Sequence, residues 1–144
     1  MVTGIDVFRI NWNPGTASDS VTLQMTNVDD ALDRVELALS MGHAFFLSDL
    51  QNLPLIRMDD ISGLVNIDVD NQVLAGPADS LNLDVREFGT NSSSSYGRGN
   101  ITVDALVETL NLEDRALSSA FGTDMSFLAG GYTTLNITGG LSGV

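Results

Sequence analysis

At 144 residues, the chain is long enough to bury a core as a single domain without a disulfide or a structural metal. Its formal net charge of −13, with six arginines and no lysine, repels nucleic acids and anionic membranes, so neither is an expected partner. The absence of cysteine excludes disulfides and thiolate metal sites, and no apolar run is long enough to span a bilayer, so no membrane insertion is expected.

The N-terminal part of the chain contains two alternating segments. Residues 5–12 predict a strand with a β-bulge at Phe8-Arg9, ended by a turn at Asn13-Pro14-Gly15. Residues 21–25 predict a second strand, because Val21, Leu23 and Met25 alternate with polar residues. The two strands could form a hairpin or the first turn of a coil.

Residues 28–41 fit both a helical stripe and a strand, and we favour a strand over 34–39. Further strands are predicted over 65–69 and 81–86, after turns at Asp59-Asp60 and Gly76-Pro77. Residues 89–100 are rich in serine and glycine and predict an exposed loop. The remainder predicts strands over 101–103 and 110–112 and a short helical turn over 115–121.

An apolar–Asn–apolar triplet recurs through the chain, and its alternation places the asparagine on the face opposite to the apolar pair. The triplets are Val65-Asn66-Ile67, Leu81-Asn82-Leu83, Leu110-Asn111-Leu112 and Leu135-Asn136-Ile137. Their uneven spacing suits a coil whose strands stack while its turns vary in length. The asparagines could form a hydrogen-bonded ladder or simply be solvated, and we favour the solvated interpretation.

A looser repeat relates residues 46–65 to residues 127–144. Phe46-Leu47 is matched with Phe127-Leu128, and residues 55–58 with residues 134–137. Together with the resemblance of residues 17–21 to residues 77–81, this indicates one domain made of two diverged halves, 1–70 and 71–144. The predicted fold is all-β, a parallel β-solenoid with irregular turns, and a β-sandwich is the alternative.

The best candidates for a metal site are acidic clusters in predicted turns. Calcium prefers six to eight oxygen ligands, which turn carboxylates and backbone carbonyls supply, and stacked turns could bring such clusters together. The candidate ligands are Asp29, Asp30, Asp59, Asp60, Asp68 and Asp70. Solvated turn residues explain the same clusters equally well.

Catalytic chemistry has few suitable residues in this chain. Without cysteine or lysine, and with His43 as the single histidine, thiol or amine nucleophiles and zinc sites are not supported. His43 is better explained as a packed or turn histidine. A pair of carboxylates could serve a glycan hydrolase or lyase, but 19 acidic residues make such pairs inevitable by chance. We therefore do not expect an enzyme.

Two segments resemble a known class of proteins. Residues 107–113 (VETLNLE) and 132–139 (YTTLNITG) are similar to repeat segments of bacterial S-layer proteins and related RTX-associated surface proteins exported by type I secretion. The resemblance covers about residues 60–144 and implies a structural solenoid that assembles with calcium on the outside of the cell. The glycine-rich calcium-binding nonapeptide of such proteins is missing, which indicates a fragment of a longer chain.

Composition and resemblance together predict an extracellular, structural segment that self-assembles into oligomers or a lattice on the bacterial cell surface. The alternative is an adhesin or carbohydrate-binding module that holds a cell-surface glycan with Tyr96, Arg98 and the loop at 89–100.

Overall fold

The protein is described here by a computed structural model that covers residues 4–11, 20–28, 31–74, 76, 78–88, 100–104, 107–115, 126–129 and 133–139. Within these ranges the regular structure consists of strands. They are β1 Val7–Asn11, β2 Ser20–Gln24, β3 Arg34–Leu50, β4 Leu55–Val69, β5 Ser80–Phe88, β6 Asn100–Asp104, β7 Thr109–Asp114, β8 Ser126–Ala129 and β9 Thr134–Gly139. No helix in the described part of the chain is long and apolar enough to cross a membrane.

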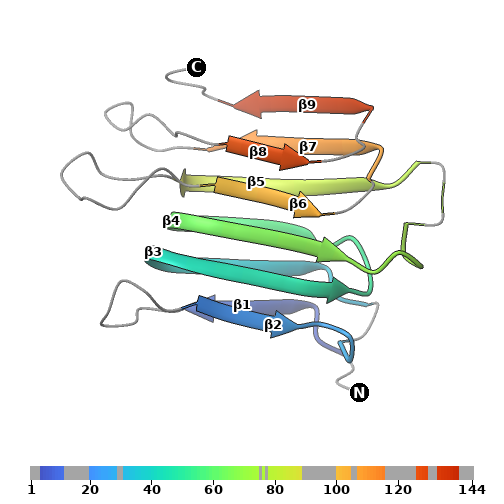
Figure 1. Ribbon diagram of the computed structural model, residues 1–144, viewed down its shortest axis with the longest axis horizontal. Coiled ribbons are helices and arrows are strands. Elements are labelled where there is room, and N and C mark those ends of the chain that lie inside the picture. The colour runs from blue at the N-terminus through green and yellow to red at the C-terminus, as the bar shows by residue number, and fades with distance from the viewer. Residues whose placement is uncertain are drawn as a thin grey trace.

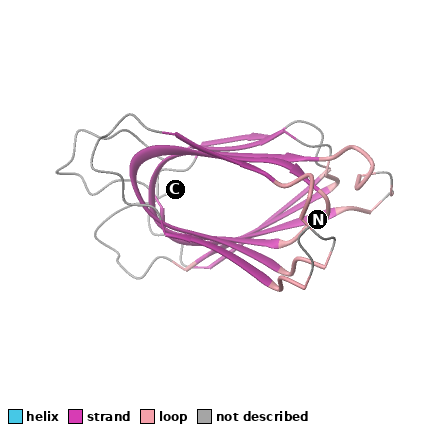
Figure 2. Cartoon of the chain, turned by 90° about the horizontal axis from the view of Figure 1, so that it is seen from below, coloured by secondary structure: helices cyan, strands magenta, loops and turns pink. Residues whose placement is uncertain are grey.

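The strands form two parallel layers joined along one side (Figures 1 and 2). The first layer has the order β1-β3-β4-β5-β7-β9, and the second has the order β2-β3-β4-β6-β8. The long strands β3 and β4 belong to both layers, and their register shifts between Met41 and Ala44, where the chain bends from one layer to the other. Every pairing among the described strands is parallel. The predicted parallel β-solenoid is confirmed, and the sandwich alternative is wrong.

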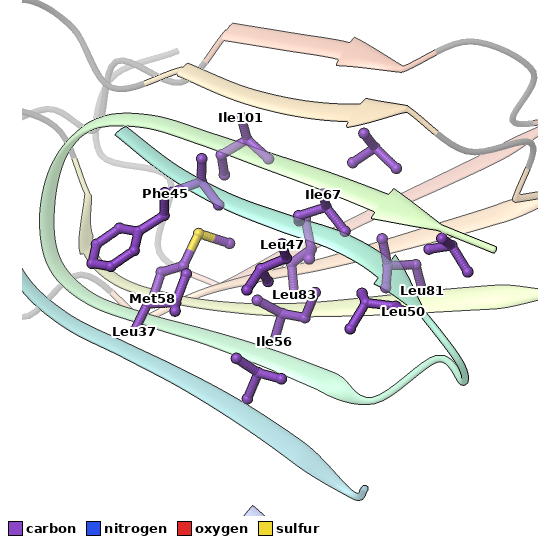
Figure 3. Packing of buried hydrophobic residues seen from close by; sticks show 14 of the residues in the cluster. Leu37, Phe45, Leu47, Leu50, Ile56, Met58, Ile67, Leu81, Leu83 and Ile101 are labelled. Atoms are coloured by element: carbon purple, nitrogen blue, oxygen red, sulfur yellow. The ribbon is translucent and has the colours of Figure 1, made fainter. Parts of the chain in front are cut away.

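The interior is filled by the apolar residues that alternate along each strand (Figure 3). Stacking in register brings these residues into columns, such as Val35–Ile56–Leu83–Leu112 in the first layer and Phe45–Val65–Ile101 in the second. Each of these side chains is at most 2% exposed. Full burial of such a side chain stabilises the fold by about 1.5–3 kcal/mol, so the two facing sets of columns hold the layers together.

The length of each coil varies, as the uneven spacing of the triplets predicts. Equivalent positions in successive first-layer strands are Val35, Ile56, Leu83, Leu112 and Ile137. The step in residue number is shortest from Val35 to Ile56 and longest from Leu83 to Leu112. The strands keep their register while the turns absorb the difference in length.

The first two strands form a coil and not a hairpin, because β1 and β2 each pair in parallel with β3. The predicted bulge at Phe8-Arg9 is wrong. Phe8 and Ile10 pack against the core while Val7, Arg9 and Asn11 are exposed, which is a regular alternation through β1.

Several predicted strands are confirmed, and one predicted turn is wrong. The strands at 34–39, 65–69, 81–86, 101–103 and 110–112 lie within β3, β4, β5, β6 and β7. The turn predicted at Asp59-Asp60 is wrong, because β4 continues through both residues to Ile61, which is fully buried. Residues 89–99, and residues 116–121 of the predicted helical turn, lie outside the described residues.

The internal repeat fits the fold only loosely. Phe127 belongs to the column of Phe45, Val65 and Ile101, so the matching of Phe46 with Phe127 is shifted by one residue. The similar segments that precede Val21 and Leu81 lead into β2 and β5, which lie in different layers. The resemblance between these segments therefore reflects strand chemistry that both layers share.

Candidate functional site

A ladder of charged residues runs across the outer surface of the first layer. Arg9, Glu36, Arg57, Asp84 and Glu113 occupy equivalent positions on successive strands. The first four each lie between two inward-facing positions, so alternation directs their side chains away from the core, and Glu113 shares their register. Opposite charges alternate along the first four members, and this alternation stabilises the pairing of neighbouring strands in the observed register.

Glu36 is the first centre of this ladder. Its carboxylate lies 2.7 Å from Arg9 Nε, 2.7 Å from Arg34 Nε and 3.3 Å from Arg57 Nη1. The arginine side chains shield the glutamate from water, although it points outward: Glu36 is 6% exposed. Contact with three guanidinium groups compensates for the cost of removing the carboxylate from water.

Asp84 is the second centre and is 2% exposed. Arg57 Nε donates a hydrogen bond to its Oδ2 at 2.8 Å, and the Nε atoms of Arg86 and Arg115 lie 3.6 Å from its Oδ1. Arg57 therefore bridges both centres, a role that suits its planar guanidinium group with several donors. The five arginines among the described residues all belong to this network.

The ladder ends at Glu113, which is half-exposed. Arg115 Nη2 donates a hydrogen bond to Glu113 Oε2 at 2.8 Å. This hydrogen bond, followed by the charges of Asp84 and Glu113, raises the pKa of Arg115 above its ordinary value. The arginine stays charged throughout the physiological range, so the network keeps its cations.

A second ladder consists of asparagines beside the charged one. Asn111 Nδ2 donates to Asn82 Oδ1 at 2.9 Å, and Asn136 Nδ2 donates to Asn111 Oδ1 at 2.8 Å. The solvated interpretation is therefore wrong for these three residues. They lie near the surface, but their side chains are hydrogen-bonded to one another. Asn66 belongs to the second layer, between Phe46 and Thr102, so one of the four triplets lies outside this column.

The asparagine ladder borders a shallow depression of about 510 Å³ on the outer surface of the first layer. Its walls include Leu55, Asn82, Asn111, Glu113, Asn136 and Thr138. We call it the asparagine groove. It differs from the predicted glycan-binding loop, whose residues Tyr96 and Arg98 lie outside the described residues.

The predicted calcium ligands are spread over both layers. Asp59 is exposed in the first layer, where its register neighbour is Arg86, whereas Asp68 is half-buried in the second layer. Asp60 lies in β4, and Asp29 and Asp30 lie outside the described residues. Among the described residues, no three histidines or carboxylates lie together in a group that could hold a metal ion. Calcium binding by these aspartates stays a prediction.

Asp70 belongs to a polar corner where successive turns stack. Gln72 donates its backbone N–H to Asp70 Oδ1 at 2.8 Å, and Gln51 Nε2 donates to the backbone oxygen of Asp49 at 2.9 Å. Gln24 Nε2 also contacts the Asp49 carboxylate. Asp49 has φ = 56°, a left-handed conformation that aspartate tolerates better than most residues. These contacts fix the turn between the layers and explain the acidic residues there in structural terms.

The two ends of the coil differ from its middle. In β9 the core-facing residues Leu135 and Ile137 are 39% and 43% exposed, whereas their counterparts Leu110 and Leu112 in β7 are buried. At the other end, the core-facing residues Phe8 and Ile10 of β1 are only partly buried. Among the described strands, β9 pairs with β7 alone and β1 with β3 alone, so each presents one free backbone edge.

His43 lies in β3, between the two register positions Met41 and Ala44 where the strand bends. Its interpretation as a structural histidine stays a prediction.

Comparisons with protein-family models, curated proteins and solved structures found no match to this chain.

Proposed function

We propose that the chain is a structural segment of a bacterial cell-surface protein, similar in role to an S-layer segment, that assembles by stacking its coils end to end with those of further copies. The observation that carries the proposal is the character of β9. Its sequence, TLNITG, has no charged residue in a chain with a net charge of −13. It exposes two aliphatic side chains beside a free backbone edge.

Edge strands of soluble proteins usually carry charges, prolines or bulges that prevent pairing with other chains. β9 has neither a charged residue nor a proline, and β1 carries Arg9 as its one charged residue. The described ends also match in pattern, because Leu135 and Ile137 occupy alternating core positions, as do Phe8 and Ile10. Placing β1 of one copy beside β9 of another would continue the parallel layer and cover the exposed aliphatic residues.

Such a contact joins two different surfaces and therefore leaves a free end after each addition. Contacts of this kind produce open filaments unless rotation closes a ring. This supports an extended, surface-forming role over a closed oligomer. Export to the outside of the cell and calcium-dependent assembly belong to the same proposal, and they rest on the resemblance of residues 107–113 and 132–139 to S-layer segments.

Sedimentation velocity over a range of protein concentrations tests the proposal. We expect the wild-type chain to grow beyond its 15.3 kDa monomer mass as concentration rises. Ile137→Lys should remain monomeric, because the new charge would be buried at the contact. Asn82→Lys adds the same charge to exposed Asn82 in the middle of the stack and should assemble like the wild type.

Two results would contradict the proposal: a wild-type chain that stays at 15.3 kDa, or assembly of Ile137→Lys equal to that of Asn82→Lys. Repeating the wild-type series with a calcium chelator tests calcium separately. Loss of assembly on chelation would support a calcium requirement. Unchanged assembly would refute that requirement and leave end-to-end stacking in place.

A further inference from the structure

The asparagine groove lies on the outer surface of the first layer, where the residues of one column change from mixed types to asparagine. In the column beside the charged ladder, Val7, Arg34 and Leu55 occupy the first three levels. Asn82, Asn111 and Asn136 occupy the next three levels, with Asn82 beside Leu55 because Ile56 pairs with Leu83. Leu55 therefore stands beside the asparagine column and lines one side of the groove, and the inward-facing residues Leu83 and Leu112 also line it.

The groove carries hydrogen-bonding groups that its own ladder does not use. Asn111 Nδ2 is occupied, since it donates to Ser80 Oγ at 2.8 Å and to Asn82 Oδ1. At the two ends of the ladder, Asn82 Nδ2 has no acceptor and Asn136 Oδ1 has no donor among the described residues. Glu113, which lines the groove, uses Oε2 for Arg115, so its Oε1 is a further acceptor.

We propose that the asparagine groove binds a neutral oligosaccharide whose chain lies along the stacking axis. Hydroxyl groups both donate and accept, so they match a site with free amide N–H groups at one end, a free amide carbonyl oxygen at the other end and a carboxylate between them. Leu55 offers an apolar contact for the carbon-bearing face of a sugar ring, in the way that ligand sites combine apolar walls with a few polar groups.

The negative charge of the molecule disfavours the binding of anionic ligands. Nucleic acids and acidic polysaccharides would be repelled by the net charge of −13 and by Glu113 at the groove wall. The ladder also has a repeat, because neighbouring strands place successive asparagines about 4.8 Å apart. A polymer with repeated hydroxyl groups can contact several levels at once. Asn82 and Asn111 lie on β5 and β7, away from the proposed contact between copies, whereas Asn136 lies on the contact strand β9, so the test uses substitutions of Asn82 and Asn111.

Affinity electrophoresis in native gels tests this inference. The gels would contain one of four neutral polysaccharides (dextran, mannan, galactan or hydroxyethyl cellulose), with polygalacturonate as the anionic comparison. We expect at least one neutral polymer to retard the wild-type chain and polygalacturonate to have no effect. Asn82→Leu should weaken binding at least about tenfold, the effect of losing a hydrogen bond to a ligand. Asn111→Leu should also weaken binding, because it removes the hydrogen bonds that hold the amides of Asn82 and Asn136 in place.

Asn66→Leu is the matched control, because Asn66 is the same residue at the centre of the same kind of triplet in the other layer. It should bind like the wild type. Circular dichroism would establish that all three variants keep the strand signal, and the effect of Asn82→Leu should survive even if Asn111→Leu proves less stable. Absence of retardation by all four neutral polymers would overturn the inference. Equal binding by folded Asn82→Leu and Asn66→Leu would also overturn it.

Discussion

Replacing Asp84 by asparagine is expected to lower the free energy of unfolding by about 2–4 kcal/mol, measured by urea denaturation followed by circular dichroism. The variant keeps the shape of the side chain but removes the negative charge that Arg57, Arg86 and Arg115 surround. Losing one partner of a buried ion pair costs about 3–5 kcal/mol, and partial exposure of the arginines to water reduces that cost.

Glu113→Gln is the matched control for Asp84→Asn. Both carboxylates occupy the same column and interact with Arg115, but Glu113 is half-exposed. An exposed ion pair contributes about 0–1 kcal/mol, so this variant should change stability little. Equal losses from the two substitutions would show that the buried centre of the ladder has no special role.

Phe45→Ala should lower the free energy of unfolding by about 3–5 kcal/mol, because it removes a fully buried ring and leaves a cavity between the layers (Figure 3). Phe46→Ala removes the same ring from the next residue, which faces outward and is half-buried. We expect a loss of about 1 kcal/mol or less there. Equal effects, measured by the same urea titration, would contradict the assignment of alternate faces in β3.

Alternation along single strands was predictable, because it depends on residues two apart. The buried positions Leu81, Leu83, Leu110 and Leu112 follow directly from the triplets that contain them. The parallel direction could also be predicted from the uneven spacing of the triplets. In a protein built of hairpins, nothing requires one triplet to recur at intervals that are both long and unequal.

The charged ladder could not be predicted, because it depends on register across coils of different lengths. The step along the chain from Glu36 to Arg57 is shorter than the step from Arg57 to Asp84, so no fixed period reveals the column. One signal was available: three of the six basic residues, Arg9, Arg34 and Arg86, fall within predicted strands or at their ends, in a chain that has no lysine. Arginine at such positions suits pairing across strands better than solvation of turns.

The error at Asp59-Asp60 has a related cause. Paired aspartates are typical of turns because their side chains bond to nearby backbone groups. In the folded chain, Asp59 pairs in register with Arg86 on the next strand, and β4 continues through it. The same lack of register information made the asparagines of the triplets look solvated when three of them form a ladder.

Disulfide formation between engineered cysteines tests the parallel stack most directly, since the natural chain has no cysteine. Asn82 and Asn111 are register neighbours on adjacent strands, about 4.8 Å apart, within the range that a disulfide can bridge. Asn66 and Asn111 lie on the outer surfaces of opposite layers, about 10 Å or more apart. The protein would be oxidised at low concentration, and its free thiols would be counted by mass spectrometry. We expect the pair Asn82→Cys/Asn111→Cys to form a disulfide and the pair Asn66→Cys/Asn111→Cys to stay reduced. Closure of the second pair without the first would contradict the stacked arrangement.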